Sequence, residues 1–312
     1  MEYRRFLEKR ISALVLGTVQ FGLDYGVANT TGKPDQSTVN TMMAAAFDAG
    51  VNAIDTAAMY NDAEMVVGQA LADLGVSEKT FICSKARPME NSSGSPEDQI
   101  EAAVERSLRR LRVDQIGLYL LHSYEALPYV DALHRKREAG DIGAVGVSVY
   151  SVEQALSAIA TPGIDAVQHP TSMLDQRFVR GGVVERAAKE GVAIFARSIF
   201  LQGLVTMDPL SLPKRIGQIR KVLVNLGRLA GDLSIEGLAL RFVLSLPNIT
   251  GVVVGMETVN QMERNLAAIE EGHLDSDLLE MIHQAVPDFS EEILDPSRWA
   301  WARDHDWGRP AV

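Results

Sequence analysis

The stretch Val51-Asn52-Ala53-Ile54-Asp55 is a short apolar run that ends in a carboxylate. Two later apolar runs, 80–83 and 116–121, also have the character of β-strands, and helix-like segments separate the three runs. In a parallel α/β barrel the ends of all strands open on one face, where catalytic groups gather. We therefore expect four groups at or just past these strand ends to form one site: Asp55, Tyr60, Lys85 and His122.

The same alternation extends along the whole chain. Apolar runs that predict strands cover residues 13–18, 51–54, 80–83, 116–121, 143–147, 164–168, 192–196 and 250–254. Runs that are apolar on both faces suit strands covered by helices, so we predict an α/β fold, a closed (β/α)8 TIM barrel in a single domain over residues 1–312. A doubly wound open sheet is the second choice. No Gly-x-Gly-x-x-Gly follows an early strand, so a bound nucleotide would not be held by a Rossmann turn.

Local signals mark where the intervening helices begin and end. Asn61, with Glu64 three residues later, suits the start of a helix after the second strand. The long amphipathic stretch 215–246 indicates helix, and we expect Gly227 and Gly231 to break it.

Composition excludes several classes of protein. A chain of 312 residues with 46% hydrophobic residues can bury a substantial core, while a net charge of −11 argues against a surface built for nucleic acid or anionic lipid. We expect a small-molecule partner. The single cysteine, Cys83, excludes an intrachain disulfide framework, the opening residues lack the apolar stretch of a signal peptide, and no run approaches a membrane span. A cytoplasmic enzyme is therefore expected.

The four strand-end residues suit proton transfer to an oxygen. An unperturbed phenol has a pKa of about 10, so Tyr60 needs a neighbour that eases proton loss, and the ammonium of Lys85 would do this. Asp55 would keep the lysine charged and oriented, and His122 would hydrogen-bond a substrate oxygen or share in a proton relay. The set fits carbonyl reduction, but it contains no hydride donor, so a cofactor would have to supply one.

Each of these residues also has an ordinary structural role. Asp55 suits a turn cap, Tyr60 a rim aromatic, Lys85 a solvated charge and His122 a loop histidine, although all four roles together are a weaker explanation than one site. No metal is expected, because the chain has no spacing such as His-Glu-x-x-His and His122 has no nearby ligand partner.

From about residue 14 to residue 268 the sequence resembles the aldo-keto reductase family. The motifs that carry the resemblance are Leu16-Gly17-Thr18, Phe21-Gly22, Ile54-Asp55-Thr56-Ala57-Ala58-Met59-Tyr60, Ser84-Lys85, Leu120-Leu121-His122, Gly146-Val147-Ser148, Gln168, Gln202-Gly203-Leu204, Gly255, Gln261 and Asn265. The resemblance implies a (β/α)8 barrel, NADP(H) as the usual cofactor and the four strand-end residues as a catalytic tetrad. Tyr60 would be the general acid in reduction and the general base in the reverse direction.

The resemblance also implies contacts with the cofactor. Ser148 and Gln168 match positions that hold the nicotinamide carboxamide, and Thr18 matches one beside the cofactor at the first strand end. The segment 198–204 matches the loop along the pyrophosphate. The residues expected to bind the cofactor are Thr18, Ser148, Gln168, Arg197, Ser198, Gln202, Gly203, Gly255, Gln261 and Asn265.

Three positions depart from the family pattern. Val149 follows Ser148 where the family often has asparagine, which removes one expected amide contact. Arg197 stands where many members place an aromatic ring, and its charge would disfavour an oxidised, cationic nicotinamide. Glu257 would repel a 2′-phosphate and favour NAD(H), unless Arg264 points inward and offsets it. NADP(H) is expected on the habit of the family, with NAD(H) as the alternative.

Two further functions fit the same residues. A non-catalytic subunit that senses nicotinamide nucleotides could keep the cofactor site. A barrel lyase could instead form a Schiff base on Lys85, but that reaction needs a neutral lysine rather than one paired with Asp55.

The remaining expectations concern the rim of the barrel. Four apolar or aromatic residues are candidates to line the substrate site: Phe21, Tyr25, Met59 and Tyr124. For Phe21 and Met59, packing in the core is an equal alternative. The tail 287–312 contains Trp299, Trp301 and Trp307, and we expect it to fold over the rim or to pack against another subunit. The oligomeric state is left open.

Overall fold

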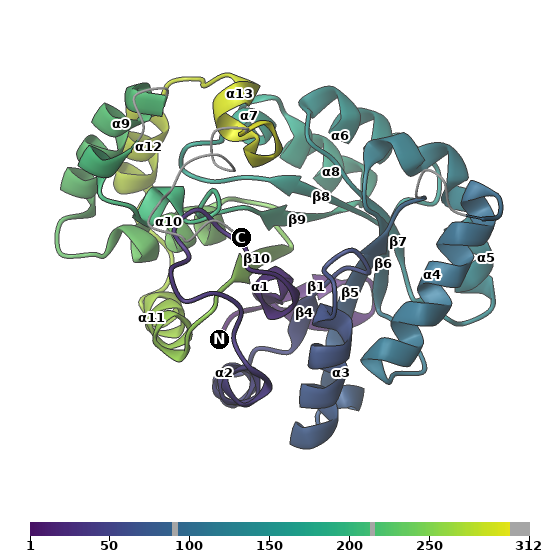
Figure 1. Cartoon of the computed structure of the whole chain (residues 1–312). Helices are drawn as coiled ribbons and strands as arrows, with labels where there is room; N and C mark the ends of the chain where they lie inside the picture. The colour runs from purple at the N-terminus through teal and green to yellow at the C-terminus, as the bar shows by residue number, and fades with distance from the viewer. Residues whose placement is uncertain (89–92, 213–215, 300–312) are drawn as a thin grey trace.

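Eight parallel strands close into one barrel in this computed structural model, which describes residues 1–88, 93–212 and 216–299 (Figure 1). The strands follow one another around the barrel in chain order, and the last pairs with the first. They are β3 Leu14–Gly17, β4 Ala53–Asp55, β5 Phe81–Ala86, β6 Leu118–Leu121, β7 Val145–Ser148, β8 Ala166–Pro170, β9 Ala193–Arg197 and β10 Gly251–Gly255. The predicted single-domain (β/α)8 barrel is confirmed, and each strand overlaps one of the eight predicted runs.

Helices surround the barrel (Figure 1). The α-helices are α1 Val19–Gly22, α2 Gln36–Asp48, α3 Ala63–Leu74, α4 Pro96–Leu111, α5 Val130–Glu138, α6 Val152–Ile159, α7 Arg177–Arg180, α8 Val183–Glu190, α9 Gly217–Ala230, α10 Ile235–Ser245, α11 Val259–Glu270, α12 Ser276–Ala285 and α13 Glu291–Leu294. Short 3-10 helices cover η1 Ser77–Lys79, η2 Tyr124–Tyr129, η3 Leu204–Thr206, η4 Pro209–Ser211 and η6 Pro296–Arg298. Among the described residues, none of the helices combines the length and the apolar character that a membrane crossing needs.

Two details of the predicted helices are wrong. Asn61 does not cap α3: it is in the left-handed region at φ 51° and donates a hydrogen bond to the carbonyl of Gly22, and Asp62 is the N-cap. Gly227 does not break the stretch 215–246, because α9 runs through it and ends at Ala230 before Gly231, which has φ 60°. A single glycine weakens a helix by only about 1 kcal/mol, which packing can offset.

A hairpin that the sequence did not indicate closes the N-terminal end of the barrel. It consists of β1 Tyr3–Phe6 and β2 Lys9–Ser12. Its only large buried ring, Phe6, lies edge-on to Phe81 and Phe195, with ring centroids 5.5 and 5.6 Å apart. The hairpin thus places an aromatic side chain against interior residues of β5 and β9.

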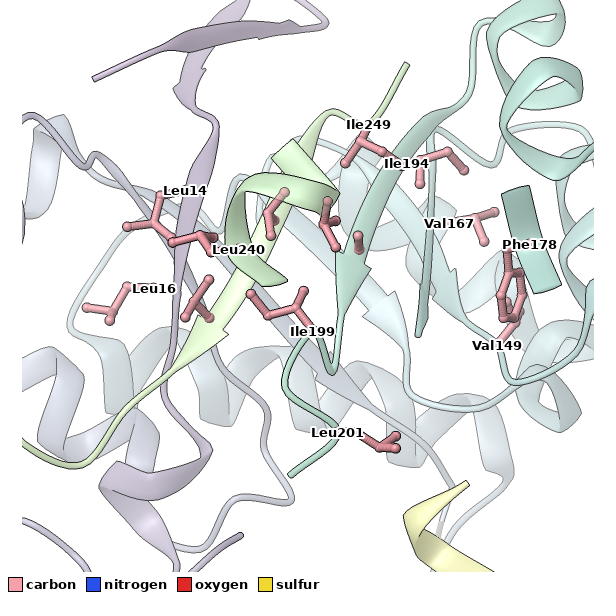
Figure 2. Close-up of a cluster of buried hydrophobic side chains, with 14 of the residues drawn as sticks. Leu14, Leu16, Val149, Val167, Phe178, Ile194, Ile199, Leu201, Leu240 and Ile249 are labelled. Atoms are coloured by element: carbon pink, nitrogen blue, oxygen red, sulfur yellow. The ribbon is translucent and has the colours of Figure 1, made fainter. Parts of the chain in front are cut away.

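Side chains alternate between the interior of the barrel and the layer under the helices. The interior apolar cluster takes every second residue, such as Phe81 and Cys83 of β5 or Leu118 and Leu120 of β6. The larger outer cluster takes the residues between them and packs against the helices (Figure 2). The next interior positions along the strands lie at their C-terminal ends. In β5 this position is Lys85, two residues after Cys83.

Candidate active site

Asp55 and Lys85 form a buried ion pair at the C-terminal ends of β4 and β5. The Nζ atom of Lys85 lies 2.5 Å from Oδ1 of Asp55 and donates a second hydrogen bond, of 2.8 Å, to the carbonyl of Thr56. Both side chains are almost fully buried, with 1% and 5% of their surface exposed. Because a buried charge is tolerated only with compensating partners, this pairing fixes the position of the ammonium group.

Tyr60 and His122 stand beside this pair. Tyr60 lies in the turn after β4, and the centroid of its ring is 5.3 Å from Nζ of Lys85. The His122 ring packs edge-on against the Tyr60 ring, with centroids 5.7 Å apart. The backbone ties these elements together, because the amide of His122 donates to the carbonyl of Ala86 next to the lysine. The structure therefore brings the four predicted catalytic residues together.

The charges of the site keep the lysine protonated. Burial is the largest influence on Lys85 and opposes its charge, but the Asp55 carboxylate and smaller effects of Tyr60 and Cys83 outweigh it. Together they raise the pKa of Lys85 above its ordinary value of 10.5. At neutral pH the group is therefore an ammonium ion that is directed at the carboxylate and the phenol ring.

The phenol and the imidazole are both neutral at physiological pH. Burial raises the pKa of Tyr60 above 10.0, and the opposing effect of the Lys85 charge is smaller. The expected net lowering of this pKa is therefore wrong, although Lys85 acts in the expected direction. For His122, burial and then the charges of Lys85 and Arg197 hold the pKa well below 6.5. Tyr60 thus keeps its proton, and His122 does not carry a positive charge.

Gln168 joins the ion pair from β8. Its amide Nε2 donates a 2.7 Å hydrogen bond to Oδ2 of Asp55, while its Oε1 atom is buried and has no hydrogen-bond partner among the described residues. Ser148 is its register partner at the end of β7 and is also buried. Thr18 approaches from the end of β3 and donates through its amide and hydroxyl to the carbonyl of Asp55. A carboxamide N–H would satisfy the unpaired Gln168 oxygen, so these residues fit a nicotinamide.

The loop after β9 has an unusual backbone. Ser198, Leu201 and Gln202 are all in the left-handed region at φ 61°, 48° and 57°, and Gly203 follows at 87°. Non-glycine residues in this region cost on the order of 1 kcal/mol each and cluster at ligand-binding segments. Gln202 also anchors the loop after β3, since it donates to the Tyr25 hydroxyl at 3.0 Å. The loop therefore has the backbone character of a ligand-binding segment and is held in place by the loop after β3.

The predicted adenosine end lies at β10 and α11. A side chain at Gly255 would meet Oε1 of Gln20 at 2.4 Å, so the backbone is closely approached there. Gln261 forms the capping box of α11 with Thr258, and its amide also donates to the carboxylate of Glu257 at 2.9 Å. Its side chain is thus already engaged.

The other residues expected at this end and at the rim occupy different environments. Asn265 is buried on α11, whereas Arg264 is exposed. Phe21 is fully buried in the core, which is the packing alternative considered for it. Burial raises the pKa of Tyr25 to about 12.

The described part of the tail packs through one tryptophan. Trp299 is buried and its indole N–H donates to the carbonyl of Ile293 at 3.1 Å. Trp301 and Trp307 lie outside the described residues.

Three residues of this region were not anticipated. Gln20 is buried beside Gly255, and its Oε1 atom has no hydrogen-bond partner in the described chain. Glu64 is buried on α3 and accepts a 2.7 Å hydrogen bond from Ser84, which directly precedes Lys85. Tyr150 carries the Arg197 guanidinium over its ring. Only Gln20 could have been assigned to the site from the sequence, because it follows Thr18 by two residues.

Within residues 1–88, 93–212 and 216–299, no group of three or more His, Cys, Asp and Glu side chains could hold a metal ion.

Comparisons with known proteins agree with this geometry. The model of the aldo/keto reductase family matches residues 13–287. The uncharacterized oxidoreductase YrpG of Bacillus subtilis is 27% identical, over 94% of this chain and 97% of its own length. Methylglyoxal reductase YeaE of Escherichia coli is 30% identical, over 78% of this chain and 82% of its own.

A solved structure supports the fold independently. The holo form of aldo-keto reductase AKR11C1 from Bacillus halodurans superposes with a TM-score of 0.77 at 23% identity, covering 95% of this chain and all of that one. At this identity the similarity concerns the fold, while the family match covers most of the sequence and confirms the resemblance. The chain belongs to the aldo/keto reductase family and is an oxidoreductase that uses a nicotinamide cofactor.

Proposed function

We propose that this protein reduces the carbonyl group of small aldehydes, ketones or keto sugars with NADPH, and that Tyr60 is the general acid. The observation that carries the proposal is the convergence of the Tyr60 ring, the Lys85 ammonium and the His122 ring at the mouth of the barrel. These groups come from three successive strand ends, those of β4, β5 and β6.

Four side chains have distinct roles in the proposed proton transfer. Tyr60 holds its proton at neutral pH and donates it from the phenolic oxygen to the carbonyl oxygen as negative charge develops there. Lys85 stabilises the phenolate that results, and Asp55 keeps the lysine charged. His122 is neutral, and it donates a hydrogen bond to the same substrate oxygen. When the alcohol is oxidised instead, Tyr60 takes the proton back.

The cofactor would be held around the other strand ends. Gln168 and Ser148 would bind its carboxamide, the 198–204 loop its pyrophosphate, and Asn265 its adenosine end. When bound, a reduced nicotinamide supplies the hydride that no side chain of the site can provide. The carbonyl then gains a hydride at carbon and a proton at oxygen, which balances the conversion to an alcohol.

Two features bear on the choice of substrate and cofactor. A relative 30% identical is named methylglyoxal reductase, which supports a small aldehyde or ketone as the substrate of this chain as well. NADPH is proposed because the family usually uses it. Glu257 opposes a 2′-phosphate electrostatically, and Arg264, which would offset this if it pointed inward, is exposed, so NADH is the alternative donor.

The alternative lyase lacks support in the geometry. A Schiff base needs a neutral lysine, whereas Lys85 is bound to Asp55 and its pKa is raised. A non-catalytic nucleotide sensor would keep the same cofactor residues, so only turnover separates it from a reductase.

The test is a fluorescence titration of the purified protein with NADPH and with NADH. Oxidation of each cofactor is then followed with a panel of small aldehydes, ketones and keto sugars. We expect saturable binding, tighter for NADPH, and cofactor oxidation that depends on both substrate and enzyme. Binding without any turnover would favour the sensor, and a substrate adduct on Lys85 trapped by borohydride would favour the lyase.

A further inference from the structure

Arg197 is a cation at the mouth of the barrel, and it forms no ion pair with a carboxylate of residues 1–88, 93–212 or 216–299. It is the last residue of β9, and its guanidinium donates to the Ser198 hydroxyl at 3.2 Å and to the Val149 carbonyl at 3.3 Å. It also lies 4.3 Å from the centroid of the Tyr150 ring. In the part of the chain that the structure describes, these neighbours are a hydroxyl, a carbonyl and a ring. The protein carries a net charge of −11, so a partly buried arginine without an acidic partner is unusual here.

The guanidinium lies over the reacting end of the barrel. Arg197 lies two residues after Phe195, whose side chain is in the interior of the barrel. The Arg197 side chain extends from β9 past β8 and contacts Val149 and Tyr150, which follow β7. Its charge reaches the reacting groups, because it contributes to the pKa shifts of Tyr60 and His122. The cation therefore lies at the same end of the barrel as the phenol and close enough to act on it electrostatically.

Among the described residues, the charges nearest the reacting groups do not cancel it. Asp55 is committed to Lys85 and to the amide of Gln168, so both of its oxygens are occupied. Arg87 adds a further positive charge near His122, one residue past β5. A guanidinium has five N–H donors, and the Arg197 contacts leave several for a ligand. Such a planar fork matches a carboxylate or phosphate in two-point hydrogen bonding.

We propose that Arg197 selects carbonyl substrates that carry an anionic group, a carboxylate or a phosphate, close to the carbonyl. The proposal rests on the proposed reductase activity and names the substrate class of that site. The carbonyl oxygen would lie at Tyr60 and His122, and the anionic group would lie at the guanidinium. Neutral aldehydes of the same shape would bind to the same place without this ion pair.

Paired substrates that differ only in charge test the proposal. We would compare kcat/KM for 4-carboxybenzaldehyde with that for its methyl ester, and for glyceraldehyde 3-phosphate with that for glyceraldehyde. The parent protein is expected to favour the anion in at least one pair, and that pair identifies carboxylate or phosphate as the group. Arg197→Gln is expected to reduce this preference on the order of 10- to 100-fold, the worth of a charge-assisted hydrogen bond. Arg197→Lys should restore part of it.

A surface arginine provides the control. Arg186 lies on α8 and pairs with Glu190 at the surface, so Arg186→Gln makes the same charge change away from the mouth. It should leave the preference as it is in the parent protein. A preference that is the same in the parent and in Arg197→Gln would overturn the proposal. Weaker NADPH binding by Arg197→Gln with an unchanged preference would assign the cation to the cofactor instead.

A binding measurement makes the outcome independent of turnover. Calorimetry with 4-carboxybenzaldehyde and its methyl ester, in the presence of NADP⁺, which has no hydride to give them, is expected to show tighter binding of the carboxylate. That difference should be lost in Arg197→Gln. If the protein turns over no carbonyl at all, the proposed reductase fails, and the calorimetric comparison still decides whether Arg197 recognises an anion. Equal binding of acid and ester by the parent protein in this experiment, together with no phosphate preference, would contradict the inference.

Discussion

The two ends of the barrel are built from the same strands and have opposite character. At the N-terminal end, Phe6 of the hairpin packs against Phe81 and Phe195, and the interior is apolar. Two to four residues further along the same strands, the interior positions hold ions and amides, such as Lys85 beside Asp55. One alternating pattern thus gives a closed apolar end and an open polar end. A residue's position along its strand, rather than the strand to which it belongs, decides whether it stabilises the fold or takes part in the reaction.

The physical costs of the two ends differ as well. Apolar burial at the closed end stabilises the fold by roughly 25 cal/mol per Å². The buried pair of Lys85 and Asp55 loses hydration on burial, and its attraction offsets that loss without a large surplus. Substitutions at the closed end should therefore change stability. Substitutions at the open end that leave the ion pair intact should mainly change turnover, because only the loss of one partner leaves a buried charge uncompensated.

The largest effect on stability is expected at the closed end. Phe6→Ala removes a buried ring and should lower the free energy of unfolding by about 3–5 kcal/mol, measured by urea denaturation. Turnover at a temperature where the variant is folded should be close to that of the parent. Leu7→Ala, at an exposed position of the same hairpin, is the matched control and should change stability little. Loss of turnover in folded Phe6→Ala would contradict the claim that the closed end affects stability but not catalysis.

The pH dependence should report the phenol of the open end alone. With NADPH saturating, kcat/KM for reduction needs protonated Tyr60, whose pKa lies above 10.0. It should therefore be level from about neutral pH to pH 10, and then fall roughly tenfold per pH unit as the proton is lost. His122 stays neutral over this range, because its pKa lies well below 6.5. An inflection close to pH 7 would instead assign the limiting proton to the imidazole.

The smallest effect is expected at the edge of the open end, where charge tunes the choice of cofactor. Glu257→Arg should raise the preference for NADPH over NADH by about tenfold, the effect of roughly 1.4 kcal/mol, measured as the ratio of dissociation constants. Glu263→Arg makes the same change at an exposed position of α11 and should leave the ratio unaltered. Equal ratios in the parent and in Glu257→Arg would remove Glu257 from the neighbourhood of the 2′ position.

Sequence patterns predicted the strands and missed the hairpin for a physical reason. The eight barrel strands are apolar on both faces, so each is visible as a continuous run. The hairpin strands Tyr3–Phe6 and Lys9–Ser12 are rich in charge and depend on distant partners. Arg4, for example, donates to the carbonyls of Leu244 and Ile249, more than 200 residues away in the chain. No local pattern carries such information.

The grouping of the four strand-end residues and the pairing of Asp55 with Lys85 were predictable, whereas the other interactions were not. Strand ends placed Asp55, Lys85 and His122 together because the barrel closes in chain order. The hydrogen bond from Gln168 to Asp55 joins residues 113 positions apart, and no local sequence pattern indicates it. The balance of influences on Tyr60 was also beyond the sequence, because it depends on how deeply the ring is buried relative to its distance from the lysine.

The central claim is that the Tyr60 hydroxyl supplies the proton at the open end of the barrel. Tyr60→Phe removes that one oxygen and leaves the ring against Lys85 and His122. The most direct measurement is kcat for carbonyl reduction in this variant, with NADPH affinity measured on the same sample and Tyr3→Phe, at the other end of the molecule, as the control. We predict unchanged NADPH affinity and a loss of kcat of roughly 10²- to 10⁴-fold. Reduction at the parent rate would contradict the account.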